Sequence, residues 1–186
     1  MNKAYTMKIA GIERDLPLCP INEDLYIAAF VMFGDVEITK ACATELLKVA
    51  PEHDIMITAE SKGIPLLYEM ARQHGENNYI VARKGPKLYM QNVYTTQVDS
   101  ITTANKQTLC LGESDRLAMK DKRVLIVDDV ISTGESLIAL ETLIKEVGGI
   151  LVGKMAVLAE GDAIGREDII YLEPLPLFDK NGNPLK

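Results

Sequence analysis

The sequence of 186 residues lacks the features that mark several classes of protein. It has no apolar run of the roughly 18 residues that a membrane-spanning helix needs, so we expect no membrane association. The N-terminus, MNKAYTMKIAGIERD, has no apolar segment before its acidic residues, which argues against a signal peptide. There is no internal repeat, low-complexity tract or linker, and the length favours a single domain over residues 1–186.

Cysteine and positive charge are also scarce. The three cysteines, Cys19, Cys42 and Cys110, are widely spaced and lack the spacing of metal ligands. An odd number of such thiols indicates plain side chains in a reducing, cytoplasmic setting. The net charge of −7 disfavours a nucleic-acid partner, because such a partner needs a basic surface. A local group of N–H donors and lysines can still bind phosphate on an acidic protein.

The sequence does contain β-rich apolar runs that alternate with helical patterns. Candidate strands are 54–59, 78–83, 123–128 and 150–160, and candidate helices are 36–49, 64–75 and 134–149. We also expect a helix that begins after Asn22 as its N-cap and ends at Gly34. This alternation predicts a parallel sheet flanked by helices, with ligands beyond the carboxyl ends of the strands. The rule points to three segments: 60–63, 83–87 and 128–136.

A polar stretch from about Lys87 to Lys122 interrupts this pattern. Within it, TTQVDSITTANKQTL is rich in threonine, asparagine and glutamine, and it alternates loosely as a β-hairpin does. A long excursion of this kind in a compact domain is usually a functional flap or a mobile segment. We therefore expect a flap here.

The segment RVLIVDDVISTGESL, residues 123–137, has the strongest chemical signature. Its apolar run ends in Asp128 and Asp129, whose carboxylates can accept hydrogen bonds from sugar hydroxyls or hold magnesium through water. A glycine at 134 lets the backbone approach a ligand, and N–H groups at a helix start favour an anion. The segment therefore predicts a ribose 5-phosphate site. Its phosphate would bind Ser132, Thr133, Gly134, Glu135 and Ser136.

VLIVDDVISTGES resembles the phosphoribosyl-pyrophosphate (PRPP) motif of the type I phosphoribosyltransferases. That motif is an apolar strand, two acids, two apolar residues, and then a small residue, threonine and glycine. A response-regulator phosphoacceptor also contains an LIVDD-like run, but its acids lie near the N-terminus and no phosphate loop follows. A plain strand with an N-cap explains less of the pattern. The resemblance implies an α/β fold with a central parallel sheet flanked by helices, a flexible flap (about 87–111) and a small hood (about 1–35).

Two further segments resemble parts of the same family, although each alone would also suit a solvated turn. TAESKGIP, residues 58–65, resembles the short loop that binds pyrophosphate largely through backbone N–H groups. ARKGPK, residues 82–87, resembles the segment whose Arg-Lys pair contacts pyrophosphate in adenine- and xanthine-type enzymes. Cations are needed there because pyrophosphate leaves with several negative charges. The resemblance places pyrophosphate contacts at Glu60, Ser61, Lys62, Gly63, Arg83, Lys84 and Lys87.

The resemblance also implies a reaction. PRPP loses pyrophosphate from C1 of its ribose, and a nitrogen of a purine base attacks that carbon through a transition state with oxocarbenium character. Asp128 and Asp129 would hold the ribose as catalytic residues. Mg²⁺ would be the cofactor, bound through PRPP with no direct protein ligand. The flap would close to exclude water, and the protein would be a homodimer, as its relatives usually are.

The base is the least defined part of the prediction. In adenine enzymes a proline-rich N-terminal segment forms a hood over the base, and here Leu18 and Ile21 would take that place. The flap lacks the Tyr-Glu-Leu-Glu-Tyr run of adenine enzymes and resembles that of bacterial xanthine phosphoribosyltransferases and a related PRPP-sensing purine repressor. Asp99, the only carboxylate in the flap, is the candidate general acid or base.

Three hypotheses therefore stand. The leading one is adenine phosphoribosyltransferase activity, which forms AMP in purine salvage, followed by transfer to xanthine, hypoxanthine or guanine. The second is a non-catalytic PRPP sensor, which the negative charge and the lack of an added DNA-binding domain disfavour. The third, a structural protein that binds no nucleotide, explains least of the pattern.

Overall fold

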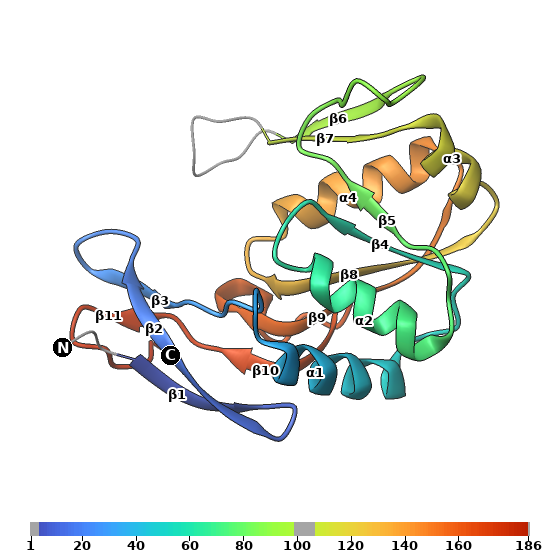
Figure 1. Cartoon of the computed structure of the whole chain (residues 1–186). Coiled ribbons are helices and arrows are strands. Elements are labelled where there is room, and N and C mark those ends of the chain that lie inside the picture. The colour runs from blue at the N-terminus through green and yellow to red at the C-terminus, as the bar shows by residue number, and fades with distance from the viewer. Residues whose placement is uncertain (1–3, 99–106, 186) are drawn as a thin grey trace.

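The computed structural model describes residues 4–98 and 107–185. Its larger sheet has five strands in the order β10-β9-β8-β4-β5, and every neighbouring pair is parallel (Figure 1). These strands are β4 (Ile55–Ala59), β5 (Ile80–Ala82), β8 (Arg123–Ile131), β9 (Ile150–Glu160) and β10 (Ile170–Leu175). The predicted α/β class with a central parallel sheet is confirmed.

Helices cover both faces of this sheet. They are α1 (Val36–Val49) and α2 (Ile64–His74) on one face, and α3 (Glu113–Met119) and α4 (Glu135–Glu146) on the other. Successive side chains of β8 alternate between the two cores: Val127 packs with α1 and α2, and Ile126 packs with α4. Because both faces of the strand are buried, its sequence is a continuous apolar run rather than an alternating one.

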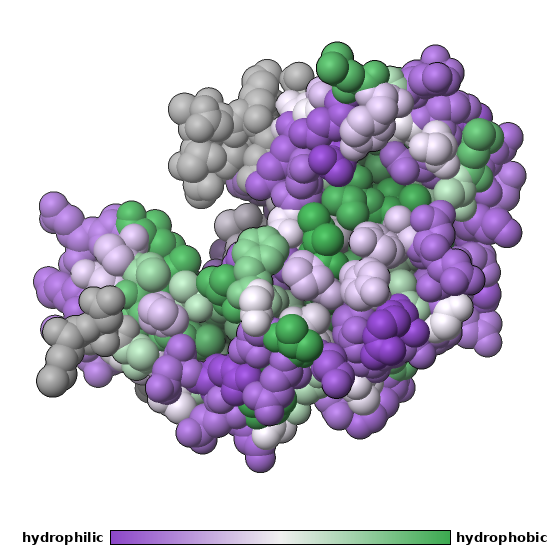
Figure 2. All heavy atoms as spheres, in the orientation of Figure 1, coloured by the Kyte–Doolittle hydropathy of each residue, from purple (hydrophilic) through white to green (hydrophobic). Residues whose placement is uncertain are grey.

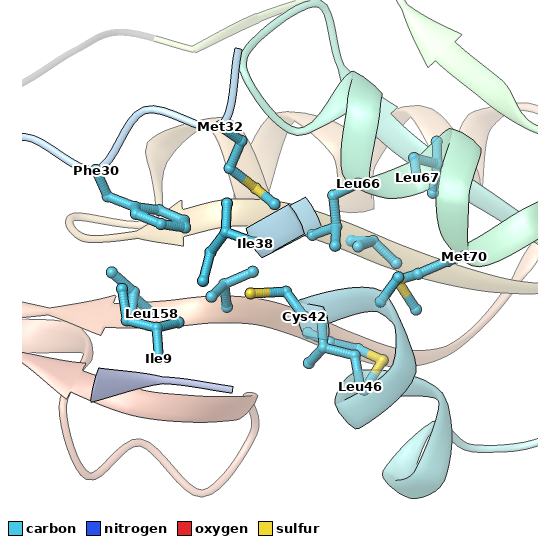
Figure 3. Close-up of a cluster of buried hydrophobic side chains, with 14 of the residues drawn as sticks. Ile9, Phe30, Met32, Ile38, Cys42, Leu46, Leu66, Leu67, Met70 and Leu158 are labelled. Carbon is cyan, nitrogen blue, oxygen red and sulfur yellow. The ribbon is translucent and has the colours of Figure 1, made fainter. Parts of the chain in front are cut away.

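The core under α1 and α2 is built from both helices and the sheet. Figure 3 shows Cys42 and Leu46 of α1 beside Leu66 and Met70 of α2, with Leu158 of β9 to their left. Burial raises the pKa of the Cys42 thiol to about 12, so this cysteine stays protonated and inert. All three cysteines are free thiols, as expected.

The ends of α1 and α2 follow from local signals. Asp35 is the N-cap of α1, and its side chain accepts a hydrogen bond of 3.1 Å from the backbone N–H of Ile38. Pro51 follows the C-cap, and Gly75 ends α2 with φ of 83°. The predicted bounds of both helices are therefore close to those observed.

The helix predicted after Asn22 is wrong, because this segment contains the strand β3 (Leu25–Ala28). The Asn22 carboxamide oxygen accepts hydrogen bonds from the backbone N–H groups of Asp24 and Leu25, at 3.0 and 2.9 Å. A helix N-cap makes the same kind of contact. Asn22 therefore forms the predicted side-chain contact, but the contact stabilises a turn and not the start of a helix. The chain then pairs with β2 (Ile12–Pro20), a partner that no local pattern reveals.

The small second sheet has the order β1-β2-β3-β11 and is called the hood here (Figure 1). It consists of β1 (Ala4–Ile9), β2, β3 and the short β11 (Phe178–Asp179). The sequence placed the hood within about residues 1–35, and β11 adds a strand from the far end of the chain. Arg14 ties the hood to α1 through ion pairs with Asp35 and Glu37, at 2.8 and 2.7 Å.

A two-stranded antiparallel hairpin, β6 (Tyr94–Val98) and β7 (Gln107–Leu111), occupies the segment predicted as a flap. Its base is fixed to the end of β5, because Arg83 and Cys110 exchange two backbone hydrogen bonds of 2.8 and 2.9 Å. Asp99 lies outside the described residues. A single 3₁₀ turn, Gly161–Ala163, follows β9. No helix in the described part of the chain is long and apolar enough to cross a membrane.

Candidate functional site

The three predicted segments meet at one edge of the larger sheet. Strand β4 lies between β8 and β5, so the loop after β4 is flanked by the loops of its two neighbours. The Ser61 hydroxyl donates a hydrogen bond of 3.3 Å to Asp128 Oδ1. Lys62 Nζ lies 2.9 Å from Asp129 Oδ2, an ion pair without the alignment of a hydrogen bond. Residues some 67 positions apart in the sequence therefore form one site.

Gly63 is required by this close approach. A Cβ atom on Gly63 would lie 2.7 Å from Thr58 Oγ1 and 2.8 Å from Asp128 Oδ1, well inside van der Waals contact. Gly63 is also the N-cap of α2, and Pro65 lies in the first turn. The residue is therefore glycine for steric reasons and not for a left-handed backbone.

Asp128 and Asp129 lie inside strand β8, which runs on to Ile131, three residues beyond the predicted end of the strand at 128. Asp129 is buried, and its backbone N–H donates a hydrogen bond of 2.9 Å to Asp128 Oδ1. Withdrawal from water, followed by the charge of Asp129, raises the pKa of Asp128 well above its usual range. Asp128 therefore holds a proton more readily than an exposed aspartate does, which lowers its repulsion of an anionic ligand.

The segment 132–136, predicted to hold the phosphate and called the phosphate loop here, comprises the connection after β8 and the first two residues of α4. Gly134 has φ of 81°, the left-handed region that favours glycine, and it is the N-cap of α4. All five predicted residues line a cavity of about 70 Å³ together with Asp128. The N-terminus of α4 faces this side of the loop, so its N–H groups and dipole favour a small anion there.

Arg166 lies beside the phosphate loop, and the sequence did not predict it as part of the site. A Cβ atom on Gly134 would lie 2.9 Å from Arg166 Nη1, so the guanidinium reaches the phosphate loop. Asp168 orients it through two hydrogen bonds of 2.9 and 2.8 Å. Nothing local marked this arginine, because it follows β9 and approaches the loop through the tertiary fold.

The cationic side of the site lies at Arg83, Lys84 and Lys87, around Glu60. Glu60 Oε1 is 3.0 Å from Arg83 Nη2, and Glu60 Oε2 is 4.0 Å from Lys87 Nζ. A hydrogen bond from the backbone N–H of Lys84 and the charge of Arg83 lower the pKa of Glu60. Arg83 Nε is buried and has no hydrogen-bond partner among the described atoms. This donor suits an incoming anion.

A second cavity of about 290 Å³, called the hood cavity here, lies between β3 and the ends of β8 and β9. Residues 27–30, the backbone that links the hood to the main body, form one wall, and Lys62 Nζ donates a hydrogen bond of 2.8 Å to the Phe30 carbonyl. Figure 2 shows the molecule hollowed between the small sheet and the rest of the chain. Asp128 lines both this cavity and that of the phosphate loop.

The predicted base contacts Leu18 and Ile21 do not line the hood cavity. Leu18 is half-buried on β2 opposite Ala28, and Ile21 is 56% exposed in the following turn. The neighbouring strand β3 and the residues after it line the cavity instead. As base-binding residues, Leu18 and Ile21 stay predictions.

Glu160 is a second residue of the site that the sequence did not predict. It is the last residue of β9, it lines the hood cavity, and burial raises the pKa of its carboxyl group. The rule that ligands bind at the carboxyl ends of parallel strands could have identified it, because an acid directly follows the apolar run 155–159. A carboxyl group with a raised pKa is protonated more readily than an ordinary glutamate, which suits a group that exchanges a proton with a ligand.

A larger cavity, about 650 Å³, lies elsewhere, between the α2–β5 connection and α3. It shares Arg83 with the predicted site but includes neither of the paired aspartates nor any part of the phosphate loop. We place the site in the two smaller cavities, because the paired acids, Lys62 and the anion loop line them.

The comparison with protein families agrees with this geometry. A phosphoribosyl transferase domain model matches residues 37–174. The chain belongs to this family. The sequence-based assignment to the type I family and its purine branch is thus confirmed.

Proteins of similar sequence carry two names, xanthine phosphoribosyltransferase and adenine phosphoribosyltransferase. A xanthine phosphoribosyltransferase from Brevibacillus brevis is 30% identical over 135 residues, which cover 73% of this chain and 60% of that protein. An adenine phosphoribosyltransferase from Rhodococcus jostii is 26% identical over 146 residues, which cover 77% of this chain and 78% of that protein. The chain thus spans less than two thirds of the length of the xanthine-type relatives from Brevibacillus brevis and Deinococcus deserti, at 60% and 64%.

Solved structures with the same fold include adenine phosphoribosyltransferases. The enzyme from Thermoanaerobacter pseudethanolicus superposes with a TM-score of 0.66 at 20% identity, covering 92% of this chain and 95% of that one. The enzyme from Saccharomyces cerevisiae, solved with adenine and an iminoaltritol bisphosphate, gives 0.63 at 17% identity and covers 92% of each chain. At these identities the likeness concerns the fold.

Proposed function

We propose that this chain transfers the 5-phosphoribosyl group of PRPP to a purine base and releases pyrophosphate. The observation that carries the proposal is the position of Asp128, which borders both the phosphate-loop cavity and the hood cavity. A ribose bound at Asp128 would extend its 5-phosphate into one cavity and its C1 substituent toward the other. The cations around Glu60 would then lie on the side of the leaving pyrophosphate.

Each part of the site has a step to perform. Asp128 and Asp129 accept hydrogen bonds from the ribose hydroxyls, and the phosphate loop holds the 5-phosphate. Arg83 and its neighbouring lysines stabilise the negative charge that pyrophosphate gains as the C1–O bond breaks. The two carboxylates lie beside the positive charge that develops on the sugar, and the purine nitrogen completes the exchange by attacking C1.

Magnesium would enter this site with PRPP. Asp128 and Asp129 offer the hard oxygen donors that Mg²⁺ prefers, so the residues present fit such an ion. Asp129 Oδ2 already faces Lys62, so the direct ligands of the ion would be substrate oxygens and water, and the aspartates would hold it through these. When bound, the ion would neutralise charge on the pyrophosphate.

We propose adenine as the base and AMP as the product, with a 6-oxopurine as the alternative. The fold of adenine enzymes and the wall formed by residues 27–30 support adenine, whereas several of the similar sequences are named for xanthine. Glu160 is the described carboxyl group best placed to exchange a proton with the base. Asp99 stays a prediction for that role.

Further parts of the proposal concern the whole protein. Residues 1–186 would form one domain, with a hood and a flap that closes over the bound substrates. It would act as a homodimer in the cytoplasm, which the three free thiols and the resemblance to dimeric relatives support. Light scattering of the purified protein would test the oligomeric state.

The decisive experiment is pyrophosphate release from PRPP and Mg²⁺ in the presence of adenine, xanthine, hypoxanthine or guanine, with orotate and uracil as controls. We expect release with one purine and none with the pyrimidines. The Asp128→Asn/Asp129→Asn double variant should lose the activity and keep its circular dichroism spectrum, and Glu146→Gln, an exposed carboxylate on α4, should keep both.

Two results would contradict the proposal. Normal turnover by the double variant would show that the ribose site has been misplaced. No release with any purine, together with measurable PRPP binding, would favour the PRPP sensor. Salt-dependent binding to nucleic acid would then strengthen that second function.

A further inference from the structure

Two histidines and a glutamate meet at the amino ends of the strands, the edge of the sheet opposite the proposed PRPP site. His53 lies in the connection between α1 and β4, His74 is the last residue of α2, and Glu76 follows Gly75. The chain has only two histidines, and the fold brings both to one carboxylate. Glu76 Oε1 lies 3.0 Å from His53 Nε2 and 2.7 Å from His74 Nδ1.

The protonation of His53 follows from its other ring nitrogen. His53 Nδ1 lies 2.8 Å from the carbonyl oxygen of Pro51, and a carbonyl can only accept, so Nδ1 carries the hydrogen. In the neutral ring Nε2 then presents a lone pair. The His53 side chain is 2% exposed, and Nε2 has no hydrogen-bond partner among the described atoms. A buried lone pair thus faces a carboxylate oxygen, and this arrangement calls for a cation between them.

The donor set selects the kind of cation. Two imidazole nitrogens and one carboxylate oxygen suit zinc and its neighbours in the first transition series, whereas calcium and magnesium prefer oxygen alone. The bond from His53 to a backbone carbonyl is the outer contact that orients metal-binding histidines and fixes their tautomer. The hydrogen bond to the Pro51 carbonyl therefore already holds His53 in the orientation and tautomer of a metal ligand.

The geometry is close to that of a bound state. The three ligand atoms lie within 4.8 Å of one another, and the two rings stack with centroids 5.0 Å apart and planes 23° apart. Zinc bonds of about 2.0–2.1 Å in a tetrahedron separate ligand atoms by about 3.3 Å. The contacts to Glu76 would therefore lengthen by some tenths of an ångström, and the two ring nitrogens, within 4.8 Å of each other, would settle at the same separation. The His74 side chain is 50% exposed, which leaves an entry path and room for a water ligand.

We propose that His53 Nε2, His74 Nδ1 and the Glu76 carboxylate bind one divalent transition-metal ion of the zinc class. The ion would tie the connection before β4 to the end of α2. The PRPP site lies beyond the opposite end of β4, five residues or about 16 Å away. This metal is therefore structural and separate from the magnesium that PRPP would bring.

Zinc titration of chelator-treated protein in the presence of a non-thiol reductant tests the proposal. Calorimetry should show one equivalent bound, and Co²⁺ should give the visible absorption of a tetrahedral site. Zinc at about 100 times its Kd should raise Tm by roughly 5–10 °C. His74→Ala and Glu76→Gln should each weaken zinc binding at least tenfold, and Glu146→Gln should bind as the wild type does. His53→Ala is avoided because a buried ring is lost.

Two outcomes would overturn the inference. Zinc binding of equal strength in both His74→Ala and Glu76→Gln would place the metal elsewhere, for example on a thiol. No binding, with Tm unchanged by zinc, would mean that only a proton joins His53 to Glu76. Neither result depends on phosphoribosyl transfer, so failure here leaves the proposed function untouched.

Discussion

Substitution of Gly63 by alanine tests the contact between the loop after β4 and the ribose site. The added Cβ would lie 2.7 Å from Thr58 Oγ1, 2.8 Å from Asp128 Oδ1 and 3.3 Å from Asp128 Cα, whereas ordinary contacts begin at 3.4 Å. Both side-chain oxygens would have to move by about 0.6–0.7 Å. Thr58 is wholly buried in β4, and Asp128 is paired with Ala156 inside β8, so neither backbone can yield easily.

Overpacking of this kind costs about 1–3 kcal/mol. A loss near 2 kcal/mol would lower Tm by about 4–8 °C in a chain of this size. We also expect kcat/KM for PRPP to fall by at least tenfold, because the displaced Asp128 would no longer meet the ribose hydroxyls.

The assay combines a thermal scan with pyrophosphate release. Gly85→Ala is the matched control for stability, since a Cβ there would meet nothing within 4 Å and the backbone φ is not positive. Gly63→Ala with unchanged Tm and unchanged activity would refute the close packing of the loop on Asp128. A lower Tm with full activity would show that the packing of Gly63 stabilises the fold but does not position Asp128 for the ribose.

Three further substitutions test the charges of the site. The raised pKa of Asp128 means that the folded state binds more protons than the unfolded state, so stability is lost as pH rises through the folded pKa. Asp128→Asn should therefore raise Tm over that of the wild type by about 2–4 °C near pH 9 and by less near pH 5. An equal rise in Tm at both pH values would contradict this. Glu160→Gln should lower kcat about 100-fold and remove one ionisation from its pH profile, whereas an unchanged profile would exclude proton transfer by Glu160. Arg166→Gln should raise KM for PRPP about tenfold with little change in kcat, and an unchanged KM would show that the guanidinium does not reach the 5-phosphate.

Local sequence determined much of this protein. The apolar run before Asp128 and the glycine at 134 predicted a buried strand, an anion loop and a following helix, because side-chain periodicity and backbone freedom act within a few residues. The same is true of α1 and α2, whose caps at Asp35 and Gly75 lie beside the residues that they end. The alternation of strands and helices then predicted where the site would form.

Tertiary structure decided what local signals could not. Asn22 makes a contact that begins either a helix or a turn, and pairing with β2 selected the strand β3. The hood also needed β11 from the far end of the chain, which no N-terminal pattern contains.

The same reason explains the missed residues of the site. Glu160 enters the hood cavity and Arg166 reaches the phosphate loop only through the tertiary fold, in which β9 lies beside β8. Gly63 is constrained by an aspartate 65 positions away. Local propensities act over a few residues, whereas strand pairing and core packing join segments that are far apart in sequence. The sequence by itself therefore determined which chemistry the strand ends carry, and only the packed sheet decided which of those side chains meet.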